Sequence, residues 1–123
     1  MDFNDPRGAR KQKKFLKDRK QLTGEILDEM IKTIKGCGAQ PFFVYISTPI
    51  AMSKIDPKNE KPSEDFFEQF CKEREIPYIF TRPYFNEVIQ KGIHLKKSGH
   101  WDAQGNQIVA QAIAEYLSKG NII

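Results

Sequence analysis

Apolar residues recur every three or four positions in two long stretches of the chain, which is the period of an amphipathic helix. The first stretch runs from about Gln12 to Lys35 and is followed by two glycines, which are typical of a helix end. The second begins after Asp102, a good N-cap residue, and ends at Lys119 and Gly120. We therefore predict an amphipathic helix over each stretch.

The segment between these helices contains two short runs that are typical of β-strands. Residues 41–48 form a continuous apolar and β-prone run closed by Pro49, as expected of a strand buried on both faces of a parallel sheet. Residues 77–81 form a second, shorter run. A polar loop over Ile50 to Lys61 is predicted between them, and it is followed by the apolar face of another helix at Phe66, Phe67, Phe70 and Cys71. Tyr84 to Lys91 can add a short helix.

This alternation of helices and strands predicts an α/β fold, because parallel strands are joined by right-handed helical crossovers. The two strands are expected to be parallel and adjacent or nearly so. Two strands alone leave two sheet edges with unpaired main-chain groups. We therefore expect a partner at an edge, either a second copy in a homodimer or a missing N-terminal half.

Composition sets the outer limits of these predictions. The chain has 123 residues, of which 39% are hydrophobic and 29% charged, as in one soluble domain over residues 1–123 rather than a disordered segment. No run approaches the roughly 20 apolar residues of a membrane span. Because no apolar leader is visible, the sequence favours a cytoplasmic location, with export open if the natural N-terminus was removed. Cys37 and Cys71 lack metal-ligand spacing, so we expect free buried thiols, no metal and no cofactor.

Positive charge is concentrated near the N-terminus. Residues 7–20 contain eight lysines and arginines and one aspartate, a net charge of +7, so the remainder sums to 4 − 7 = −3. Residues 1–14 are therefore interpreted as a basic N-terminal arm or helix start that could meet nucleic acid, anionic lipid or an acidic partner. Nucleic acid is disfavoured, because no interleaved aromatic residues or recognised nucleic-acid fold accompany the charge.

His100 is the residue best suited to proton transfer. It lies in a short polar loop, two residues before the helix that begins after Asp102. An imidazole on a loop is partly in water and can exchange a proton at neutral pH. A structural role, with the ring hydrogen-bonded to main-chain groups, is the alternative for a single loop histidine.

The stretch from Ser98 to Leu117 reads S-G-H-W-D-x-x-G-N-x-x-V-A-x-A-I-x-x-Y-L and resembles the last motif block of SGNH/GDSL hydrolases. In that family the histidine is the general base of a Ser-His-Asp triad. The resemblance therefore implies His100 as the base of an ester hydrolase or acyltransferase acting on an ester or acylated substrate. It also implies a three-layer flavodoxin-like parallel sheet, of which this chain would form the C-terminal half. The His-Trp pair also resembles the one in related acetyltransferases that modify cell-envelope polysaccharides.

The chain departs from this family at two of the catalytic positions. Ser98 stands where the family has its acid, and a hydroxyl cannot carry the charge that stabilises an imidazolium. The Gly-Asp-Ser nucleophile block is missing from residues 1–40, so the nucleophile would come from elsewhere. Residues 1–6 resemble the close of the family's Gly-x-Asn-Asp block, which implies Asn4 as an oxyanion donor. An ordinary turn before a helix is the alternative for this short match.

Two further interpretations remain open from the residues alone. Ser47 and Thr48 follow the first strand, at the carboxyl edge where open α/β sheets place their sites. A nucleophile there is conceivable, but without a strained elbow such as Gly-x-Ser-x-Gly the pattern favours a turn. The alternative to an enzyme fragment is a non-catalytic interaction module whose basic arm binds an acidic partner.

Overall fold

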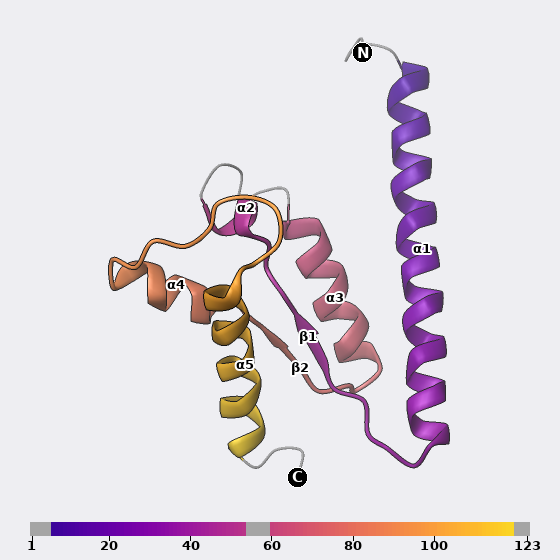
Figure 1. The fold of residues 1–123 in the computed structure, drawn as a ribbon. Coiled ribbons are helices and arrows are strands. Elements are labelled where there is room, and N and C mark those ends of the chain that lie inside the picture. The colour runs from indigo at the N-terminus through magenta and orange to yellow at the C-terminus, as the bar shows by residue number, and fades with distance from the viewer. Residues whose placement is uncertain (1–5, 54–59, 120–123) are drawn as a thin grey trace. The chain divides into compact units, whose positions relative to one another are not determined.

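The computed structural model describes residues 6–53 and 60–119 (Figure 1). The chain divides into two compact units, residues 1–41 and residues 42–123. The first unit contains one long helix, and the second contains the two strands and four helices. Asn4, one of the predicted site residues, lies outside the described residues.

The first unit is formed by α1 (Pro6–Gly36), which confirms the long helix predicted from about Gln12 to Lys35 and extends it toward the N-terminus. Proline suits the first turn of a helix, where its missing N–H costs no intrahelical hydrogen bond. The helix ends at Gly36, and Gly38 in the turn that follows has a φ of 79°, in the left-handed region that glycine adopts at helix C-termini. Beyond it, the main-chain N–H of Ala39 donates to the oxygen of Ile34 at 3.2 Å.

The second unit is built on two parallel strands, β1 (Phe43–Tyr45) and β2 (Tyr78–Phe80). They pair in a register that places Phe43 opposite Tyr78 and Tyr45 opposite Phe80. The predicted parallel and adjacent arrangement is therefore confirmed. The connection between them includes α3 (Lys61–Glu73), as the apolar face at 66–71 predicted. Phe67 of this helix packs edge-on against Tyr45 and Phe80, with ring centroids 5.3 and 5.5 Å apart.

Two helices follow β2, and together they enclose an apolar core. These are α4 (Arg82–Gln90), which begins two residues before the predicted short helix, and α5 (Ala103–Ser118), which follows Asp102 as predicted. The buried members of this core are Met52, Phe85, Ile108 and Val109. The core thus joins the last two helices to the segment that follows β1.

The segment after β1 differs from its prediction as a polar loop from Ile50. Residues 49–52 form one helical turn, α2 (Pro49–Met52), and Ala51 and Met52 are buried. Thr48 caps this turn, because its hydroxyl oxygen accepts a hydrogen bond from the N–H of Ala51 at 3.2 Å. Ala51 and Met52 therefore contribute to the core instead of forming a solvated loop, whereas Ile50 is exposed. Residues 54–59 of the predicted loop lie outside the described residues.

The expected three-layer flavodoxin-like parallel sheet is wrong. The structure is mostly helical (67%), with a two-stranded parallel sheet. The apolar pattern of residues 41–48 predicted a long buried strand, but the pairing of β1 with β2 ends after Tyr45. There the N–H of Ser47 donates to the side-chain oxygen of Thr81 at 2.9 Å instead of to a neighbouring strand. Two strands of three residues each provide too little surface to hold helical layers on both faces.

Two further expectations concern membranes and thiols. None of the described helices is long and apolar enough to cross a membrane. Both cysteines are free, as predicted, but only Cys71 is buried, whereas Cys37 is exposed just after the end of α1. Burial raises the pKa of the Cys71 thiol to about 11. Cys71 is therefore a neutral thiol of the apolar interior.

Candidate functional site

Trp101 connects the carboxyl end of β1 with the turn that contains His100. Its indole N–H donates a hydrogen bond to the main-chain oxygen of Ser47 at 2.6 Å. Its ring stacks on Phe85 of α4, with centroids 4.3 Å apart and planes 11° from parallel. These two contacts, one polar and one apolar, fix both the position and the tilt of the indole. The neighbouring His100 is therefore held beside this end of the sheet.

The local sequence explains why the turn has this shape. Gly99 has a φ of 74°, in the left-handed region that favours glycine, so the chain reverses directly before His100. Asp102 caps α5, because its carboxylate accepts a hydrogen bond from the N–H of Gly105 at 3.1 Å. A Cβ on Gly105 would lie only 2.6 Å from a ring carbon of Trp101. Glycine at 105 is therefore required for the indole to pack over the start of α5.

The carboxyl ends of β1 and β2 are joined by side-chain and main-chain hydrogen bonds. The Thr81 hydroxyl accepts from the N–H of Ser47 at 2.9 Å and donates to the oxygen of Tyr45 at 3.1 Å. Ser47 and Thr81 are both fully buried. Within the described residues, the Ser47 hydroxyl has no hydrogen-bond partner. Ser47 is enclosed where the carboxyl ends of the two strands meet, beneath Trp101, and no solvent reaches it. The prediction of a turn at Ser47 therefore fits this position better than the alternative of an accessible nucleophile.

A cluster of charged side chains lies beside this junction. Arg82, the first residue of α4, contacts Glu64 at 2.8 Å and Glu60 at 3.1 Å. Glu60 also accepts a hydrogen bond from the N–H of Thr48 at 3.3 Å. Burial is the main reason that the pKa of Glu60 is raised above its ordinary value. The cluster therefore ties α3 and α4 to the segment after β1.

Tyr45 lies at the edge of the same cluster. Burial, with the nearby carboxylates of Glu60 and Glu64, raises the pKa of its phenol to about 12. Both causes disfavour the negatively charged phenolate. Tyr45 is therefore a neutral hydrogen-bonding group at physiological pH and is unsuited to act as a base there.

A small recess lies next to the His100 turn. It has a volume of about 130 Å³. Its lining residues are Met52, Ser53, Ile89, Ile93, His94, Leu95, Lys96 and Lys97. The Lys96 amine lies 3.8 Å from the position that a Cβ on Gly99 would occupy, so this lining reaches the turn. The lining of the recess combines apolar side chains with two cationic ones, Lys96 and Lys97.

The predicted site residues have the following positions in the structure. His100 and Ser98 are both exposed, one on each side of Gly99. Within the described residues, the His100 imidazole makes no hydrogen bond or ion pair. It therefore lacks the contact with Ser98 or a main-chain carbonyl that would orient the ring of a general base. Asp102 is occupied as the cap of α5 and does not orient the ring. Asn4 lies outside the described residues, so its expected oxyanion role stays a prediction.

Groups of His, Cys, Asp and Glu that could hold a metal ion are absent from residues 6–53 and 60–119.

The Arg82 cluster was not anticipated from the sequence, although an arginine directly after a predicted strand is a signal for it. The Trp101 contact was also missed. A single tryptophan next to the candidate histidine is the signal that could have indicated an anchor.

Comparisons with other proteins do not assign this site. No known family, curated protein sequence or solved structure matches this chain. The chemistry of the site is therefore inferred from the residues and their geometry.

Proposed function

We propose that this protein supplies the general base His100 for ester hydrolysis or acyl transfer, with the serine nucleophile provided by another chain or segment. The observation that carries this proposal is the anchored but open position of His100. Trp101 holds the main chain of the turn through the 2.6 Å hydrogen bond to Ser47. The His100 imidazole itself is exposed and makes no hydrogen bond to other described residues. A general base needs access to a second reactant, and the anchored main chain limits where the exposed imidazole can lie.

In the proposed reaction, His100 removes the proton of the serine hydroxyl as the oxygen attacks the ester carbonyl. The imidazolium then returns the proton to the departing alcohol, which leaves an acyl-serine. Water, or the hydroxyl of an acceptor, attacks this acyl-serine while His100 removes its proton, and the same proton returns to the serine oxygen as the acid or the new ester departs. Ser98 occupies the position of the usual acid, where it can orient the ring once a substrate closes the site but cannot neutralise the imidazolium. The chain alone is therefore expected to be nearly inactive.

The recess beside the turn suits the acyl group of such a substrate. Met52, Ile89 and Leu95 give it apolar walls, and its small volume favours an acetyl group or one of similar size. Lys96 and Lys97, which also line the recess, would add positive charge near a developing oxyanion. Short acyl esters are therefore the substrates to test first.

The test is hydrolysis of p-nitrophenyl acetate by the full chain mixed with a separate protein segment that carries a Gly-Asp-Ser nucleophile block. The mixture should be active, and His100→Ala should lower kcat by about a hundredfold or more. Circular dichroism should be unchanged, because His100 is exposed. Gln104→Ala, an exposed substitution in the first turn of α5, is the matched control and should leave the rate unchanged.

Activity that survives His100→Ala would overturn the proposal. Loss of folding together with activity in that variant would also overturn it, since His100 would then have the structural role. Either result would leave the non-catalytic interaction module as the better interpretation.

A further inference from the structure

The segment between α4 and α5 carries positive charge that no acidic residue of its own balances. Residues 88–101 contain three lysines and two histidines but no aspartate or glutamate. Lys91 is paired with Glu87 of α4 at 3.4 Å. Lys96 and Lys97, by contrast, are exposed, and neither forms an ion pair with another described residue. Two neighbouring cations without a partner create a positive local potential that attracts an anion.

The Lys96 side chain lies against the turn before His100. Its ammonium is 3.8 Å from the position that a Cβ on Gly99 would occupy. Within the described residues, the main-chain N–H groups of residues 96–100 donate no hydrogen bond. Such N–H groups are further donors for an anion that a nearby cation attracts. The turn therefore offers charged and neutral donors within one short segment.

The recess next to this turn is lined by cations and apolar side chains. Lys96 and Lys97 line it together with the apolar walls described above, and none of its lining residues is acidic. Its volume of about 130 Å³ admits a short aliphatic group. A small ligand with one anionic end and one short apolar end therefore matches the turn and the recess together.

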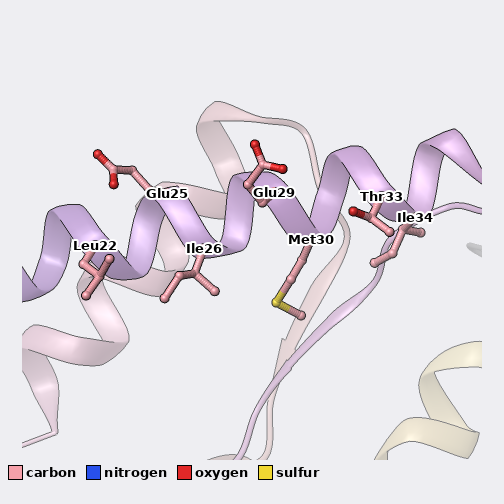
Figure 2. Close-up of a pocket in the computed structure, with 7 residues that line it drawn as sticks. All are labelled: Leu22, Glu25, Ile26, Glu29, Met30, Thr33 and Ile34. Atoms are coloured by element: carbon pink, nitrogen blue, oxygen red, sulfur yellow. The ribbon is translucent and has the colours of Figure 1, made fainter.

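The hollow along α1 has the opposite charge. Figure 2 shows Leu22, Ile26 and Met30 in its lining, where the charged side chains are those of Glu25 and Glu29. Two carboxylates repel an anion, so an anionic ligand is disfavoured there. The sign of the charge thus separates this hollow from the recess beside the turn.

We propose that the turn and the recess bind a small phosphate monoester, with the phosphate at Lys96 and Lys97 and its short apolar group in the recess. A phosphate monoester carries about two negative charges at neutral pH, which match two unpaired ammonium groups. Lysine is a point charge with three donors and suits phosphate, whereas the planar fork of arginine suits carboxylates.

As a statement about the substrate, this inference rests on the proposed function: the ester on which His100 would act carries a phosphate group. Binding of the phosphate requires no hydrolysis, because the lysines and the main-chain donors belong to this chain. The binding site and the reaction are therefore tested separately.

The first experiment titrates the nitrogen-15-labelled full chain with ethyl phosphate at pH 8 and follows its assigned amide NMR signals. Assigned signals are needed because residues 7–20, with their net charge of +7, also attract anions. The signals of residues 96–100 should shift to saturation. Inorganic phosphate should bind about fourfold more weakly or worse, because it buries no methylene group. Propionate, with a single charge, should bind about tenfold more weakly. Absence of saturable shifts in residues 96–100, or equal affinity for inorganic phosphate or propionate, would overturn the proposal.

Three substitutions of the same kind test the assignment of the lysines. Lys96→Gln and Lys97→Gln should each weaken ethyl phosphate binding about tenfold, because each removes one charge-assisted contact. Lys91→Gln is the matched control, since it removes the same charge from a lysine that is already paired with Glu87. It should bind ethyl phosphate like the wild type. Equal weakening in all three variants would indicate general attraction of anions and would contradict a site at this turn.

The second experiment compares two acetate esters in the assembled mixture with the nucleophile segment. These are 2-acetoxyethyl phosphate and the neutral 2-methoxyethyl acetate, and release of acetate is measured. The phosphate ester should have a kcat/KM about tenfold higher or more. The double variant Lys96→Gln, Lys97→Gln should lose this preference, and Lys91→Gln should keep it.

The two experiments separate failure of this inference from failure of the proposed function. Saturable binding of ethyl phosphate at residues 96–100 without hydrolysis of either ester would support the binding site and overturn the proposed function. Hydrolysis of both esters with equal kcat/KM would support the proposed function and overturn the phosphate-bearing substrate.

Discussion

The indole N–H of Trp101 donates a hydrogen bond to the main-chain oxygen of Ser47, 54 positions earlier in the chain, at 2.6 Å. This contact joins the turn before α5 to the end of β1, and Ser47 is fully buried beneath it. The main-chain oxygen of Ser47 has no access to water there. The contact therefore both positions His100 and satisfies a buried polar group.

Trp101→Phe should destabilise the second unit by about 1–3 kcal/mol, because the phenyl ring keeps the stack on Phe85 but leaves the Ser47 oxygen unpaired. The free energy of unfolding in urea measures this loss. His100→Ala is the matched control and should change stability by less than about 0.5 kcal/mol, since His100 is exposed. Equal stability of Trp101→Phe and wild type would show that the hydrogen bond contributes nothing.

Gly105→Ala should destabilise the protein by about 1–3 kcal/mol, because the added methyl group would lie 2.6 Å from the Trp101 ring. Gly36→Ala is the control, since nothing lies within 4 Å of a Cβ at that position. Thermal unfolding of the two variants compares the same chemical change with and without the clash. A destabilised Gly36 variant beside an unaffected Gly105 variant would contradict the described packing of Trp101.

Arg82→Gln should destabilise the protein by about 2 kcal/mol at pH 7, because it leaves the carboxylates of Glu60 and Glu64 close together without their cation. The loss should shrink at pH 4, because burial raises the pKa of Glu60 and its protonation there relieves the repulsion. Lys72→Gln, which removes an exposed pair with Glu68, should cost less than about 1 kcal/mol. Urea unfolding at the two pH values measures both variants. A loss that is independent of pH would argue against repulsion as its cause.

Tyr45 should make stability fall between about pH 10 and 12. The raised pKa, about 12 in the folded chain against the ordinary value of 10.0 for a tyrosine, means that the unfolded chain releases this proton first. Rising pH therefore favours unfolding over this window, and the contribution of Tyr45 is fully present below about pH 10. Tyr45→Phe should remove this part of the slope when unfolding is measured from pH 9 to 12. An unchanged slope in the variant would assign the effect to other groups.

Ser98→Asp should raise kcat in the assembled ester-hydrolysing mixture, because an ionised acid stabilises the imidazolium formed during attack. The gain should disappear in the Ser98→Asp, His100→Ala double variant. Steady-state hydrolysis of p-nitrophenyl acetate measures both. A gain that persists without His100 would show that the new carboxylate acts by itself.

Much of the local structure was predictable because it depends on neighbours in the sequence. The period of apolar residues predicted α1 and α5, and Asp102 was identified as a cap because its carboxylate acts three residues away on Gly105. The parallel pairing of β1 and β2 was also predictable, since a helix between two strands favours a right-handed crossover. The charge asymmetry within α1 is likewise a property of the sequence alone.

Tertiary structure decided where those elements end and what surrounds His100. The strand predicted over residues 41–48 ends at Tyr45. Beyond it, the main-chain N–H of Ser47 donates to the side-chain oxygen of Thr81, 34 positions later in the chain, and not to another strand. Trp101 became the anchor of the turn because folding brought the Ser47 oxygen to its N–H edge and Phe85 to a face of its ring. Periodicity records which face of an element is apolar but not which distant group meets it. Contacts between residues far apart in the chain therefore determined the extent of the sheet and the position of the candidate base.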